Sequence, residues 1–252
     1  MPFCWNCGKE IGVEDIFCPH CGSRIDKREE KALELPAQQI RRTDAVSAIQ
    51  KGLDIVSAKP IVLAPALLGA VVSAVLSFIA SFWFMPLEWW SWYYWPGALG
   101  LMVIGGLLGL IGGIVAFVMG FASLDMSRNA YLNKDLDVSS SVNYVIKRFL
   151  TFILASIVGA ILSITVILFP VAILMFVIIV VDEIGISPAL SGAIRVLGNR
   201  LADIIVLLII AIIGNLIVGL IPVVGPLLSA AFNVLMGLAF IDIYFNYKST
   251  GS

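Results

Sequence analysis

The sequence predicts an all-α polytopic membrane bundle of six transmembrane helices with short amphipathic interfacial helices, preceded by a small β module. Three observations support this fold class. Apolar residues make up 60% of the 252 residues and charged residues only 13%, whereas soluble domains are nearer half apolar and a quarter charged. Long uncharged runs follow one another from Ile61 onward. All four cysteines lie within the first 21 residues, which indicates a separate polar module there.

The four cysteines form two copies of one short motif, CWNCG at residues 4–8 and CPHCG at residues 18–22. Each copy offers two thiolates from a tight turn, and its glycine permits the positive φ that lets backbone N–H groups point at the sulfurs. Four thiolates complete the tetrahedral shell of a structural Zn²⁺ at about 2.3 Å, with no open position for chemistry. We therefore predict one structural zinc ion, with the ligands Cys4, Cys7, Cys18 and Cys21.

This module of about 25 residues has too small a core to fold alone, so zinc would supply its folding free energy. The spacer at residues 8–17 is long enough for a short β-hairpin. A disulfide pair, a redox dithiol and an iron site are the alternatives. No secretory signal is visible, which favours a metal site in a reducing compartment over a disulfide. His20 is expected to face solvent, because four cysteines already complete the shell.

Two resemblances to known families follow from these residues. CWNCG and CPHCG resemble the zinc-ribbon family, over about a tenth of the chain. The segment VDEIGISPAL at residues 181–190, followed by Ala193, Ile194 and Arg195, is similar to uncharacterised prokaryotic multi-pass membrane proteins. It is also similar to the membrane domain that precedes the catalytic domain in some glycerophosphoryl diester phosphodiesterases. No soluble segment is long enough for such a catalytic domain, so nothing enzymatic is carried over.

The predicted domains are a zinc ribbon at 1–25, a charged linker at 26–44 and a membrane domain at 45–252. The predicted spans are 61–84, 98–124, 149–168, 170–181, 204–221 and 227–247. The uncharged run at 149–181 exceeds one crossing of a ~30 Å hydrocarbon core at roughly 1.5 Å per residue, and Phe169-Pro170 divides it. Prolines and a glycine at 222–226 turn the last hairpin. The aromatic residues of 86–96 favour the headgroup region, with an aromatic core cluster as the alternative.

The positions of the basic residues predict the topology. With six spans and a cytosolic N-terminus, all 16 Lys and Arg fall on the cytosolic side, as the positive-inside rule requires. One long tilted helix over 149–181 would instead place Arg195 and Arg200 outside. We therefore predict a multi-pass protein of the cell membrane with both termini cytosolic.

Each predicted hairpin is preceded by a segment that mixes basic and apolar residues, at 45–59, 138–149 and 186–200. In the middle segment the apolar residues recur at helical spacing, which is typical of a helix lying along the inner headgroup layer. A plain cytosolic loop helix is the alternative. Three hairpins of similar plan predict a threefold pseudo-repeat.

Polar residues near lipid are the remaining candidate sites. Asp125, Asp182 and Asp242 end three spans on the cytosolic side, where the helix dipole disfavours negative charge. They are expected to be hydrated or to pair with nearby basic residues, namely Lys147, Arg148, Arg195 or Arg200. The alternative is an acidic vestibule for a cation or proton. Asn215 and Asn233 are predicted to form an interhelical polar pair that serves helix packing, with a solute path as the alternative.

The sequence contains no arrangement typical of an enzyme. A single histidine, His20, excludes Ser/His/Asp and Cys/His nucleophile arrangements, and no Gly-rich phosphate loop occurs. We expect a non-enzymatic scaffold or accessory protein, anchored in the lipid bilayer, whose zinc ribbon docks a cytosolic protein. A transporter or channel for a small solute or ion is the alternative, although transporters usually keep their sites at the bilayer midplane. A net charge of −1 gives no reason to expect a nucleic-acid partner.

Overall fold

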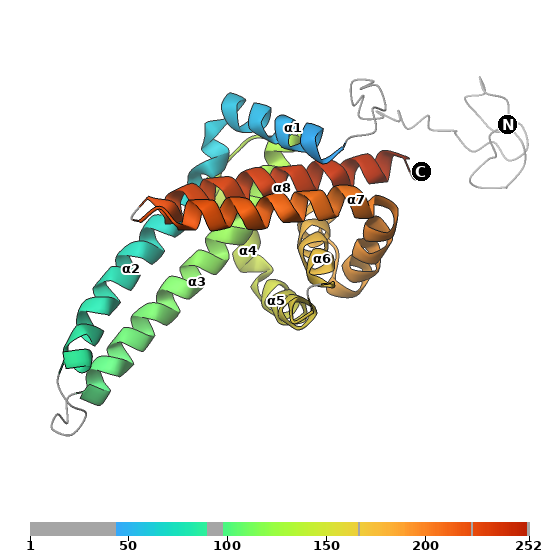
Figure 1. Cartoon of the computed structure of the whole chain (residues 1–252). Coiled ribbons are helices and arrows are strands. Elements are labelled where there is room, and N and C mark those ends of the chain that lie inside the picture. Colours follow the sequence, from blue (N-terminus) through green and yellow to red (C-terminus); the bar gives the residue numbers. More distant parts are fainter. Residues whose placement is uncertain (1–43, 90–97, 166, 223, 251–252) are drawn as a thin grey trace, which may run out of the picture. The chain divides into compact units, whose positions relative to one another are not determined.

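The computed structural model describes residues 44–89, 98–165, 167–222 and 224–250, and in this part of the chain the regular elements are all helical (Figure 1). These elements belong to one unit, Arg42–Ser252. They are α1 (Ala45–Ala58), the 3₁₀ helix η1 (Pro60–Leu63), α2 (Ala64–Trp89), α3 (Ala98–Tyr131), α4 (Val138–Lys147), α5 (Phe149–Ser163), α6 (Phe169–Val181), α7 (Ile186–Gly219) and α8 (Gly225–Thr250). The predicted zinc ribbon, the linker and most of the aromatic segment lie outside the described residues.

Each of the six predicted spans coincides with a helix, but six crossings are not confirmed. Among the described residues, four segments are long and apolar enough to cross a membrane: Pro60–Ala80, Val103–Tyr131, Ile186–Gly219 and Gly225–Thr250. The pair α4 and α5 would form a fifth crossing, bent by 75°. Helices α5 and α6 have 15 and 13 residues, so each is only roughly 20–23 Å long against a ~30 Å core.

The break between α5 and α6 falls near the predicted proline. Helix α5 ends at Ser163, whose hydroxyl donates to the carbonyl of Gly159 at 2.7 Å. Such side-chain bonds to the preceding turn compete with the helical ladder. Pro170 occupies the first turn of α6, where its missing N–H costs no helical hydrogen bond. The predicted boundary at residue 168 is therefore late for the end of α5 by five residues.

The three predicted amphipathic segments are helical. Asp44 and Asp137 begin α1 and α4 by accepting hydrogen bonds from backbone N–H groups of the first turn, the usual role of an N-cap carboxylate. The third segment forms the first half of α7, which bends at Arg200, where φ is −130° and ψ is 30°. Arg200 therefore breaks α7 into two helical parts, and the predicted boundary between 186–200 and 204–221 falls at this break. No proline marks the break, and buried residues lie on both sides of it, among them Val196, Ile204 and Leu207.

Each amphipathic helix packs on the second helix of the preceding hairpin: α4 on α3, α7 on α6, and α1 on α8. The last contact returns from the end of the chain to its beginning. Glycines allow close approach at two of these contacts. A Cβ atom on Gly52 of α1 would lie 2.9 Å from Leu235 Cδ1 of α8, and one on Gly192 of α7 would lie 3.3 Å from Ile178 Cδ1 of α6. The same kind of helix contact thus occurs three times, between α4 and α3, between α7 and α6, and between α1 and α8.

Helix α6 is the most completely buried of these helices. Nine of its 13 residues are buried, which explains why it is apolar on every face. Large apolar side chains are exposed mainly on the outer helices, among them Phe78 of α2, Leu110 of α3, Leu150 of α5 and Leu216 of α7. Such extensive apolar exposure is typical of helices whose solvent is lipid.

Candidate functional site

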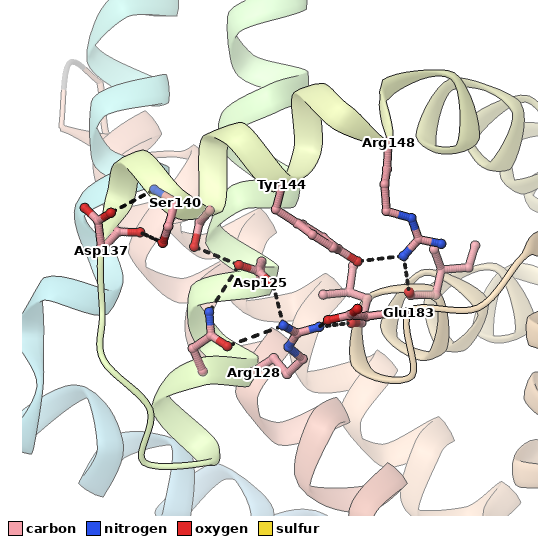
Figure 2. A network of polar contacts seen from close by, with 11 residues as sticks. Asp125, Arg128, Asp137, Ser140, Tyr144, Arg148 and Glu183 are labelled. Carbon is pink, nitrogen blue, oxygen red and sulfur yellow. Dashed lines mark hydrogen bonds and ion pairs between the residues drawn. The ribbon is translucent and has the colours of Figure 1, made fainter.

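The first polar group of the membrane unit is centred on Arg128 of α3 (Figure 2). Its guanidinium is buried and lies 3.2 Å from Asp125 Oδ1 and 2.8 Å from Glu183 Oε1. It also donates to the backbone carbonyl of Val180 at 2.6 Å. A buried cation is tolerated only when charges and hydrogen bonds compensate for its lost hydration. Arg128 therefore ties α3 to the end of α6.

Asp125 connects the same group to α4. Its Oδ2 accepts from the hydroxyl of Ser141 at 2.8 Å and from the amide of Asn129 at 3.2 Å. Both Asp125 and Ser141 are buried. Ser141 lies one turn before the buried Val145, so it is a polar residue on the buried face of an amphipathic helix. That position is the signal by which the sequence could have identified it.

Arg148, at the bend between α4 and α5, donates hydrogen bonds to a tyrosine hydroxyl and to backbone carbonyls rather than to a carboxylate. One nitrogen donates to the hydroxyl of Tyr144 at 2.9 Å and another to the carbonyl of Ile184 at 2.9 Å (Figure 2). Ile184 follows Glu183, whose φ of 56° is in the left-handed region. Two arginines thus hold the turn between α6 and α7.

The second polar group is centred on Asp242 of α8, which is 1% exposed. Its Oδ1 lies 2.8 Å from Lys51 Nζ of α1 and accepts from the hydroxyl of Tyr131 of α3 at 2.7 Å. Asn246 donates to its Oδ2 at 3.2 Å. Lys51 also donates to the Tyr131 hydroxyl at 2.6 Å. This group joins α1, α3 and α8, so it joins the start of the membrane unit to its end.

The third group is smaller and less buried. Asp182, directly after α6, accepts from the hydroxyl of Tyr244 at 2.5 Å and lies 3.0 Å from Lys248 Nζ. Both partners come from α8. The Lys248 side chain is 57% exposed. The group therefore lies at the surface of the bundle.

The three aspartates are thus paired, but with other cations than those expected from the sequence. Their partners are Arg128, Lys51 and Lys248. Of the cations expected to pair with them, Arg148 donates to a tyrosine and to carbonyls, and Arg200 lies 3.5 Å from Asp203. Lys51 and Lys248 are far from their partners in sequence and are brought to them by helix packing, whereas Arg128 lies three residues after Asp125 on the same helix.

The convergence of these aspartates on one vestibule stays a prediction. Each of Asp125, Asp182 and Asp242 has its own set of partners in the structure. Within the part of the chain that the structure describes, no group of three or more His, Cys, Asp or Glu could hold a metal ion.

The structure brings Asn215 of α7 and Asn233 of α8 together. Asn215 Nδ2 donates to Asn233 Oδ1 at 2.9 Å and to the carbonyl of Ala211 at 2.9 Å. The hydroxyl of Ser229 donates to Asn215 Oδ1. Hydrogen bonds of this kind hold neighbouring helices together where no water is available.

This asparagine pair lies in the wall of a large cavity. The cavity has a volume of about 1,210 Å³ and is lined by residues of all three hairpins. Its lining is mainly aliphatic and aromatic, with serines and the two asparagines as its polar side chains. The volume exceeds that of common small-molecule pockets, which is about 300–1,000 Å³.

The four predicted zinc ligands lie outside the described residues, but they fall within a family match. Residues 3–25 match the model of the zinc-ribbon domain, and this range contains Cys4, Cys7, Cys18 and Cys21. Their paired thiolates have the donor chemistry that a structural Zn²⁺ requires.

The resemblance to the phosphodiesterase membrane domain has no support from these comparisons. No curated protein and no solved structure matches the chain. The zinc-ribbon match and the long apolar helices together describe a membrane protein with a zinc-ribbon domain at its N-terminal end.

Proposed function

We propose that this protein is a non-enzymatic scaffold or accessory protein, in which the membrane unit anchors a zinc ribbon that docks a cytosolic protein. The observation that carries the proposal is the zinc-ribbon match at residues 3–25. A zinc ion held by four thiolates has no open position for a substrate. The ribbon would therefore act through its surface, as a binding site for another protein.

The polar groups of the membrane unit support an anchoring role. The carboxylates of Asp125, Asp182 and Asp242 each have a cation within 3.2 Å. Two of these carboxylates are buried and bind residues of two or three helices. Groups paired in this way fix the packing of helices rather than act on a substrate.

A ribbon variant tests the docking proposal. The double substitution Cys7→Ser and Cys21→Ser removes one thiolate from each CxxC motif, whereas His20→Asn retains all four. We expect one zinc per chain in the native protein and in His20→Asn, and none in the double variant. Chemical cross-linking in cells should capture the same cytosolic protein with the first two forms and lose it with the third. Equal capture by all three forms would contradict the proposal.

We also propose that both termini are cytosolic and that the α5–α6 hairpin crosses the bilayer. The basic residues support this orientation, since in the six-span topology all 16 Lys and Arg would fall on one side, as the positive-inside rule requires. Single cysteines introduced at Thr165 and at Ser249, in a chain whose native cysteines are replaced, would be labelled with a membrane-impermeant maleimide. We expect labelling of intact cells at Thr165 and labelling at Ser249 only after permeabilisation. Labelling of both from one side would exclude the six-span topology.

A transporter or channel for a small solute or ion is the second candidate. The cavity between the three hairpins favours it, as does the asparagine pair in the cavity wall. In this function the carboxylates of Asp125, Asp182 and Asp242 would form an acidic vestibule. Proton or solute flux into vesicles containing the purified protein, abolished by Asp242→Asn, would favour transport over the scaffold. Flux no greater than in empty vesicles would leave the scaffold as the better proposal.

A further inference from the structure

The large cavity has an aromatic and aliphatic wall. Phe117 and Phe121 of α3, Phe176 of α6 and Phe240 of α8 all line it. The rings of Phe121 and Phe176 are in edge-to-face contact with centroids 5.5 Å apart, an arrangement favoured by aromatic pairs. The wall therefore offers apolar contact over much of its area.

The polar part of the lining carries no charge. It consists of two amides and several hydroxyls, and no Asp, Glu, Lys, Arg or His is among the lining residues, which all lie in the described part of the chain. An ionised headgroup brought into such a site would lose its hydration without gaining a counter-ion, which is costly in a membrane interior. The lining thus suits an uncharged molecule.

Asn233 provides a hydrogen-bond donor at this wall. Its Oδ1 accepts from Asn215, while its Nδ2 group has no acceptor among the residues that the structure describes. Asn233 is exposed and lines the cavity. It stands eight residues into α8 from Gly225, or about 12 Å along the helix at 1.5 Å per residue. In a crossing helix this depth is near the middle of a ~30 Å core.

The cavity is also continuous with the lipid-facing surface. Ile212 and Leu216 of α7 line it and are 53% and 67% exposed. Both are apolar and both lie on a helix that is long enough to cross the membrane. A molecule dissolved in the bilayer could therefore reach the cavity without passing through water.

We propose that this cavity binds one uncharged lipid, with its hydrocarbon chain against the phenylalanines and a hydroxyl or ester oxygen accepting a hydrogen bond from Asn233 Nδ2. The anchoring function leaves this site unassigned, and the transport candidate uses the cavity as a path for a small solute or ion rather than as a lipid site. Diacylglycerol has the required chemistry and serves as the probe.

Photo-cross-linking tests the site directly. The full-length protein is placed in phosphatidylcholine vesicles that contain a diacylglycerol with a photoreactive acyl chain, or phosphatidylglycerol with the same chain. After irradiation, peptide mass spectrometry locates the adducts. We expect adducts of the diacylglycerol on cavity-lining residues such as Ile212 and Leu216, at least fivefold above those of the anionic lipid.

Glycine substitutions on α3 provide a matched pair. A Cβ atom at Gly120 or at Gly113 would meet no atom within 4 Å, so a side chain can begin at either position without a clash. Gly120 lines the cavity and Gly113 does not. We expect Gly120→Leu to reduce the cavity adducts at least fivefold, and Gly113→Leu to leave them unchanged.

A second variant keeps the test valid if Gly120→Leu fails to fold. Asn233→Leu retains the apolar cavity but removes the donor, and it should reduce diacylglycerol adducts without lowering those of the anionic lipid. Adducts of both lipids at equal levels would overturn the requirement for an uncharged ligand. Adducts absent from the cavity, or unaffected by both folded variants, would overturn the site itself.

Discussion

Asp125 of α3 and Asp242 of α8 stand at corresponding positions of two helices but are neutralised in different ways. Both are buried. Each accepts a hydrogen bond of 3.2 Å from the amide of the asparagine four residues later, Asn129 or Asn246. Asp125 takes its cation from its own helix, three residues on, whereas Asp242 takes Lys51 from α1.

The difference shows that the same Asp and Asn spacing on two helices does not decide where the cation comes from: it comes from the same helix for Asp125 and from another helix for Asp242. Arg128 is buried and also serves Glu183 and the Val180 carbonyl. The Lys51 side chain is 34% exposed, so water can supply some of the hydrogen bonds that the Lys51 ammonium group donates. Removal of Arg128 should therefore lower the free energy of unfolding much more than removal of Lys51.

Replacement of Arg128 should have the largest effect. In Arg128→Met the Asp125 carboxylate stays buried without its cation, and breaking a buried pair in this way costs about 3–5 kcal/mol. The free energy of unfolding of the purified protein in detergent micelles measures this loss. Arg195→Met removes an exposed arginine and should change stability by less than about 0.5 kcal/mol. Equal stability of the two variants would show that the buried network contributes nothing.

Replacement of Lys51 should have an intermediate effect. In Lys51→Met the hydroxyl of Tyr131 and the amide of Asn246 can still donate to Asp242. We expect a loss of about 1–3 kcal/mol, as for a buried group that loses one partner. A double-mutant cycle with Asp242→Asn isolates the coupling between the two residues. A loss as large as that of Arg128→Met would remove the distinction between the two groups.

Replacement of Asp182 should have the smallest effect. Its cation, Lys248, is more than half exposed, and such pairs contribute about 0–1 kcal/mol. Asp182→Asn is therefore expected to lower the free energy of unfolding by no more than about 1 kcal/mol, measured as above. Lys248→Met alone should likewise lower it by no more than about 1 kcal/mol. A loss comparable to that of Lys51→Met would mean that the hydrogen bond from Tyr244 outweighs the ion pair.

The sequence led us to expect that all three aspartates are hydrated or paired with nearby basic residues at the interface. Asp182 is partly exposed, but Asp125 and Asp242 are buried. A carboxylate at the end of an apolar helix looks the same in sequence whether another helix covers it or water does. The covering helices here are α4 and α1.

The positions of the helices could be predicted because they depend on local composition. Uncharged runs, the proline at 170 and the capping aspartates Asp44 and Asp137 mark where helices begin or end. The hydrogen bond between Asn215 and Asn233 was also accessible, since the hairpin turn fixes the register of the two helices. Helix ends were less accessible, because α5 stops at Ser163, five residues before the predicted end of that span.

The sequence by itself determined that this is a membrane protein with a zinc-ribbon domain at residues 3–25, because hydropathy and cysteine spacing are properties of short segments. The tertiary structure alone decided which groups meet. Tyr131 reaches Asp242 across 111 residues, α1 closes the ring of helices on α8, and three hairpins leave a cavity between them. These outcomes depend on how helix surfaces fit together. That fit depends on side chains from all parts of the chain, so it cannot be predicted from any single segment.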